Sequence, residues 1–106
     1  MSLLPYEFSP IARLELEQAV DTYEIESPGT GLRFADEVES AILLLRQFPK
    51  SAPVLRGRIR AKVVTGFPFT IYYSPKPAVL RVLAVAHQRR QPLYWLGRLV
   101  LSLIHI

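Results

Sequence analysis

The sequence predicts an α+β fold in which a helical hairpin packs on a mainly antiparallel β-sheet, in the order β-α-α-β-β-β. Two observations carry this prediction. Apolar residues recur at helical spacing over residues 10–48, whereas residues 54–86 show strand patterns separated by turn residues. The apolar faces of two short helices need a sheet to cover them. With 106 residues, of which 50% are hydrophobic, we expect one domain over residues 1–100.

The first half contains one short strand and the two helices. Residues 3–8 suggest a strand, and Pro5 favours a sheet edge or a strand start because proline cannot donate a ladder hydrogen bond. Ser9-Pro10 predicts a helix start, and Ser27-Pro28-Gly29 predicts its end. The second helix is predicted from apolar residues four and three apart: Phe34, Val38, Ala41, Ile42, Leu45 and Phe48.

The second half is predicted to form a three-stranded meander. Residues 54–65 alternate, so a single strand should carry Arg56, Arg58, Arg60 and Lys62 on one face. Residues 69–74 and 78–86 form the next strands, separated by proline-containing turns. The last strand is apolar on both faces except at Arg81, which is typical of a covered inner strand.

Charge is divided between the two halves of the sequence. Residues 1–39 contain all nine acidic and only two basic residues, a net charge of −7, and the remainder contains eleven basic and no acidic residues. The second half is therefore expected to present a basic surface to a polyanion or an acidic partner, after partial neutralisation by the first half.

The amino-acid composition limits the kinds of functional site that we expect in this chain. The chain lacks cysteine and has two histidines, so we expect no disulfide, metal site or cofactor. The sequence shows neither a secretion signal nor an apolar run that could span a membrane, which favours the cytoplasm.

Two groups of residues are candidates for function. The four bases of the first group have strand spacing close to that of successive phosphates, although charges on an edge strand also prevent aggregation. In the second group, His87 could act as a general acid or base, with Arg89 and Arg90 stabilising charge on a phosphate. Tyr94 and Trp95 could stack on bases or pack over the end of the sheet.

Several motifs follow one another along the chain: Ser9-Pro10 with Ala19-Val20 to Tyr23, Gly31 to Phe34, Phe48-Pro49, Gly57 to Arg60, Phe67 to Tyr73, and Val82 to His87 leading into Arg89-Arg90, Pro92, Tyr94 and Trp95. In the order and spacing of these motifs the sequence resembles the RelE/ParE toxins of bacterial type II toxin–antitoxin systems, and this resemblance covers nearly all of residues 3–100. It implies a heteromeric complex with an acidic antitoxin encoded by the adjacent gene.

The resemblance leaves the target open. RelE-like members are similar to ribonucleases that cut messenger RNA on the ribosome, which would make His87, Arg89, Arg90 and Tyr94 catalytic. Two arginines of their pattern fall on Thr70 and Gln88 here. These departures favour a ParE-like toxin that poisons DNA gyrase without enzymatic activity, with Arg56, Arg58, Arg60, Lys62 and Trp95 contacting the target or the antitoxin. A non-toxic basic RNA-binding module is the third alternative.

The last six residues stand apart from the rest. Residues 101–106, LSLIHI, are compatible with codons resembling a transposon end used in sequencing libraries, so we expect a non-native tail.

Overall fold

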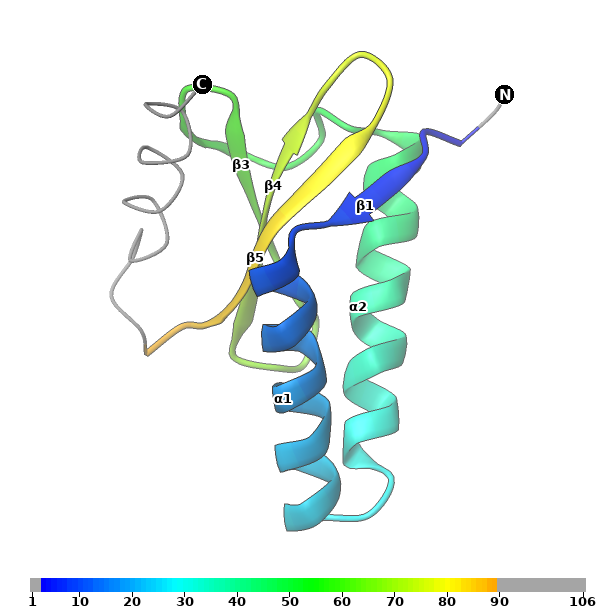
Figure 1. Ribbon diagram of the computed structural model, residues 1–106, viewed down its shortest axis with the longest axis vertical. Helices are drawn as coiled ribbons and strands as arrows, with labels where there is room; N and C mark the ends of the chain where they lie inside the picture. The colour runs from blue at the N-terminus through cyan, green and yellow to red at the C-terminus, as the bar shows by residue number, and fades with distance from the viewer. Residues whose placement is uncertain (1–2, 90–106) are drawn as a thin grey trace.

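The computed structural model describes residues 3–89 and confirms the predicted fold class (Figure 1). A mostly antiparallel sheet has the strand order β1-β5-β4-β3-β2, with β1 parallel to β5. The elements in chain order are β1 (Tyr6–Phe8), α1 (Pro10–Glu26), α2 (Thr30–Gln47), β2 (Val54–Arg56), β3 (Ile59–Val63), β4 (Phe69–Pro75) and β5 (Leu80–His87). Figure 1 shows α1 and α2 side by side, with β1 beside β5.

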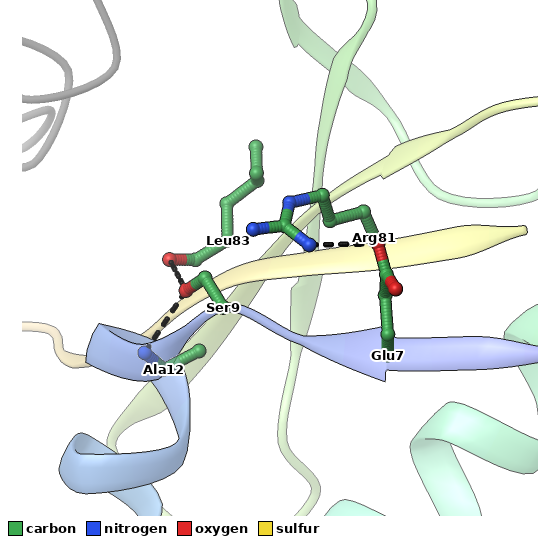
Figure 2. Close-up of polar contacts among 5 residues, drawn as sticks. All are labelled: Glu7, Ser9, Ala12, Arg81 and Leu83. Carbon is green, nitrogen blue, oxygen red and sulfur yellow. Dashed lines mark hydrogen bonds and ion pairs between the residues drawn. The ribbon is translucent and has the colours of Figure 1, made fainter. Parts of the chain in front are cut away.

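Ser9 joins three elements at the predicted helix start. Its side-chain oxygen accepts a hydrogen bond from the backbone N–H of Ala12 (3.1 Å), which caps α1, and its hydroxyl donates to the carbonyl of Leu83 on β5 (3.0 Å). Next to it, Arg81 of β5 forms an ion pair with Glu7 of β1 at 2.7 Å (Figure 2). The edge position of β1 and the helix start are therefore confirmed.

The turn between the helices depends on Gly29, Gly31 and Glu24. Gly29 has φ of 91°, in the left-handed region that favours glycine. A Cβ atom on Gly31 would lie 2.4 Å from the carbonyl oxygen of Val20, so the helices approach closely there. The Glu24 carboxylate accepts hydrogen bonds from the backbone N–H groups of Gly29 and Leu32, both at 3.1 Å. These bonds, with the Gly29 bond largest, lower the pKa of Glu24.

The core lies between the helices and one face of the sheet. Its fully buried members include Phe34 and Leu45 of α2, Ile71 and Tyr73 of β4, and Val82 of β5. An aromatic cluster fills one end of this layer, with ring centroids 4.8–6.0 Å apart in the contacting pairs, and it comprises Tyr23, Phe34, Phe67 and Phe69. At the other end, the Tyr73 hydroxyl donates to the carbonyl of Pro49 (2.8 Å), which anchors the chain where it leaves α2.

The prediction of one strand over residues 54–65 was wrong. The chain turns at Gly57 (φ 57°) and Arg58, so β2 and β3 form an antiparallel hairpin in which Arg56 is paired with Ile59. Because paired residues share a face and neighbours alternate, Arg56 lies on the face opposite to Arg60. Arg56, Arg58, Arg60 and Lys62 therefore do not form a single basic face. The alternation of apolar and basic residues did not reveal the hairpin, because a two-residue turn interrupts this alternation over only two positions.

Candidate functional site

Arg60 and Lys62 are the two bases that share a face of β3. They are paired with Tyr73 and Ile71 of β4, whose side chains belong to the core, and both bases are half-buried. The guanidinium of Arg60 donates to the carbonyls of Lys50 (3.0 Å) and Ala52 (2.8 Å). Arg60 thus fixes the segment between α2 and β2 and is less available to a ligand than the sequence suggested.

Arg58 and Arg56 are exposed and lie at different places on the hairpin. Arg58 occupies the turn between β2 and β3, whereas Arg56 ends β2, the edge strand of the sheet. Arg58 lines a cleft together with Arg60, Lys50 and Lys76. The structure thus regroups the predicted basic ladder into a cluster that contains two of its members.

Lys50 and Lys76 were missed by the sequence analysis. Lys50 follows Pro49 at the end of α2, and Lys76 lies between two prolines in the β4–β5 turn. Single lysines in turns carry no periodic signal, because their proximity depends on how the turns meet in space.

His87 ends β5 and is half-buried. Its Nδ1 accepts a hydrogen bond from the backbone N–H of Arg89 (2.9 Å), and its ring packs edge-on against Phe69 with centroids 5.1 Å apart. An accepting Nδ1 assigns the proton of the neutral ring to Nε2. His87 is thus oriented to offer an Nε2–H donor, while Arg89 is exposed beyond the strand.

A cavity of about 340 Å³ lies beside His87 and is lined by Glu15, Tyr23 and Glu26 of α1. The Glu15 carboxylate accepts a hydrogen bond from the backbone N–H of Val85 (3.0 Å). Val85 lies past the part of β5 that is paired with β1, so Glu15 satisfies a backbone donor there in place of a neighbouring strand. Burial, and secondarily the charge of Glu26, raise the pKa of Tyr23. Two carboxylates near the cavity would repel a phosphate, which argues against an RNA backbone binding there.

Thr70 lies on the sheet face opposite the helices. It is buried and paired with Val63 of β3 and Ala86 of β5, and its neighbour on this face, Tyr72, is paired with Ala61 and Ala84. Gln88, the other departure from the ribonuclease pattern, is exposed after β5, with its N–H donating to the carbonyl of Pro68. Among the strands of residues 3–89, both residues paired with Thr70 are apolar.

Several predictions lie outside the described residues. They concern Arg90, Tyr94, Trp95 and the suspected tail at 101–106. Within residues 3–89, no group of three or more His, Cys, Asp or Glu side chains could hold a metal ion. In the same part of the chain, no helix is long and apolar enough to cross a membrane.

Comparisons with known proteins agree with the observed fold. The family model described as "ParE toxin of type II toxin-antitoxin system, parDE" matches residues 6–92. A solved structure described as "Chromosomal ParDE TA system from P. aeruginosa" is similar with a TM-score of 0.70 and 16% identity, covering 80% of this chain and 96% of that chain. No curated protein sequence matches. Because the family model spans most of the sequence, the chain belongs to the ParE toxin family of type II toxin–antitoxin systems.

Proposed function

We propose that this toxin inhibits growth by poisoning DNA gyrase and is held inactive by an acidic antitoxin encoded by the adjacent gene. The observation that carries the proposal is the environment of Thr70. On the sheet face where the ribonuclease pattern places an arginine, Thr70 is buried between Val63 and Ala86. A phosphodiester-cleaving site needs preorganised donors for the developing negative charge, and losing one costs about 10²- to 10³-fold in rate.

The residues around His87 support the same proposal. Its Nδ1 is occupied by the backbone of Arg89, and Glu15 and Glu26 line the cavity beside it. One oriented imidazole beside carboxylates is a poor site for a polyanionic substrate. A target recognised through protein surfaces fits these features better, and the proposal takes this target to be gyrase in the cytoplasm.

The test follows macromolecular synthesis after induction. Pulse labelling should show that DNA synthesis stops before protein synthesis, and purified toxin should inhibit gyrase supercoiling without cutting ribosome-bound message. If translation stops first and message is cut in the ribosomal A site, the toxin is a ribonuclease and the gyrase proposal is wrong.

Substitutions at His87 separate chemistry from structure. In His87→Asn, the side-chain amide oxygen can accept the N–H of Arg89 but cannot exchange a proton. Growth inhibition should persist in His87→Asn and in the matched variant Thr70→Val, which removes only the hydroxyl. Loss of inhibition in His87→Asn, with an unchanged circular dichroism spectrum, would assign His87 an acid–base role.

Co-expression tests the antitoxin. The product of the adjacent reading frame should co-purify with this chain and abolish its toxicity, because an acidic, partly amphipathic segment can pair with the basic half and cover apolar surface. Separate elution of the two products would contradict the proposed complex.

A further inference from the structure

A cleft lies where three turns of the fold converge. It is lined by the chain leaving α2, the β2–β3 turn and the β4–β5 turn, which gather at the end of the molecule drawn uppermost in Figure 1. Its volume of about 1050 Å³ slightly exceeds the ~300–1,000 Å³ typical of ligand sites.

Four cations line this cleft: Lys50, Arg58, Arg60 and Lys76. Among the described residues, its lining includes no aspartate or glutamate, and none of the four forms an ion pair with a carboxylate of residues 3–89. Arg60 is already bound to two carbonyls, so its charge is fixed in position but not neutralised. The cleft therefore has a concentrated positive charge with no internal counter-charge.

The remaining lining is largely apolar and rigid. The apolar residues of the lining are Phe48, of which 55% is exposed, together with Leu4, Pro49, Pro75 and Pro77. Proline contributes apolar surface without a backbone donor, and its ring restricts the turns that carry Lys50 and Lys76. Such a lining loses less entropy on binding than a flexible one.

We propose that this cleft docks a segment of the antitoxin in which acidic residues alternate with apolar side chains. Carboxylates would pair with Arg58 and the two lysines, while an apolar side chain covers Phe48 and the prolines. Nucleic acid is disfavoured, because its interfaces are more polar than this half-apolar lining. The chain's own segment after residue 89 contains no aspartate or glutamate side chain that could pair with these cations.

This inference rests on the proposed function only for the identity of the partner. The chemistry of the cleft can be tested with a fluorescein-labelled peptide in which glutamate and leucine alternate, whether or not the chain is toxic. The adjacent-gene product, purified with the chain, then tests the source of the natural segment.

The sharpest variant is the charge reversal Arg58→Glu combined with Lys76→Glu, and the matched control is Arg56→Glu. Arg56 is exposed on the same hairpin but does not line the cleft, so the contact with the antitoxin that the sequence suggested for it is not part of this proposal. Arg60 is left intact because its bonds hold the backbone. The double variant should weaken binding of the peptide and the antitoxin about 10-fold or more at low salt, and Arg56→Glu less than about 3-fold.

Four results would overturn the inference. Equal weakening by Arg56→Glu would indicate general charge attraction, and competition by oligo-dT that depends on Arg58 would indicate a nucleic-acid site. Loss of toxicity with unchanged antitoxin affinity would assign the cleft to the target. Concentration-dependent dimerisation abolished by the double variant would assign it to a second copy of the chain. Harmlessness of the wild-type chain would instead refute the proposed function and leave the binding measurement standing.

Discussion

Replacing Ser9 by alanine should destabilise the fold by more than the loss of one hydrogen bond, because the Ser9 hydroxyl forms hydrogen bonds with both α1 and β5. The side-chain oxygen accepts a hydrogen bond from the backbone N–H of Ala12 at the start of α1, and the hydroxyl O–H donates one to the carbonyl of Leu83 on β5 (Figure 2). The backbone N–H of Ser9, which alanine keeps, donates to the carbonyl of Val82 (2.9 Å). The substitution therefore removes two hydrogen bonds and leaves the strand pairing formally intact.

The magnitude follows from these two bonds. Loss of a helix N-cap costs ~1 kcal/mol, within a range of ~0.5–2. Loss of the donor to a partly buried carbonyl costs about another 1 kcal/mol. Ser9→Ala should thus lower the free energy of unfolding by ~2 kcal/mol, and the melting temperature by roughly 8–16 °C for a domain of this size.

Urea unfolding followed by circular dichroism measures this change, with Ser40→Ala as the control. Ser40 is exposed in the middle of α2, and its replacement should change stability by less than ~0.5 kcal/mol. Ser9→Thr keeps the hydroxyl and should remain near wild type, whereas Ser9→Asp keeps the cap but cannot donate to Leu83. The argument fails if Ser9→Asp is as stable as wild type, since the contact with β5 would then contribute nothing.

Three further predictions concern other contacts. Gly31→Ala should lower the free energy of unfolding by ~1–3 kcal/mol, because its Cβ would lie 2.4 Å from the Val20 carbonyl oxygen; an unchanged urea midpoint would show that the helices separate freely. Tyr73→Phe should cost about 1–2 kcal/mol in the same assay by leaving the Pro49 carbonyl without its donor, and a cost near zero would mean that water replaces the hydroxyl. Folding lowers the pKa of Glu24 from 4.5, so the ionised carboxylate contributes to stability above pH 4.5. This contribution should disappear as the pH falls through the lowered pKa. A Glu24→Gln variant whose stability falls in parallel with that of the wild type down to acidic pH would contradict this.

The sequence was most informative where local chemistry determines local structure. Ser9-Pro10 marked the start of α1, and the residues around Pro28 marked its end. The apolar spacing identified the buried face of α2, except at Phe48, which follows the helix and is 55% exposed. The inner strand β5 was predicted from its apolar run. Arg81, the one charged residue in that run, forms an ion pair with Glu7. The signals for the two helices and for β5 each lie within a few residues of the element that they specify, whereas the pairing of Arg81 with Glu7 is a long-range contact.

Prediction failed where the outcome depends on contacts between distant segments. Alternation over residues 54–65 is compatible with one strand or with a tight hairpin, and the positive φ of Gly57 decides between them. The cleft depends on Lys50 and Lys76, which are far apart in sequence and meet only because three turns converge. Likewise, nothing near His87 in the sequence indicates that Glu15 and Glu26 of α1 lie beside it.

The parallel pairing of β1 with β5 has a consequence for how the toxin is made. Tyr6, Glu7 and Phe8 pair with residues 80–82, so β1, which is synthesised early, cannot pair until β5, the last strand of residues 3–89, has been made. Closing such a long loop is slow compared with forming the helical hairpin. During translation, the helices can form while their apolar faces still lack most of the sheet, so the nascent chain exposes surface that a partner could cover early. An antitoxin present at that moment would meet the toxin before its fold is complete.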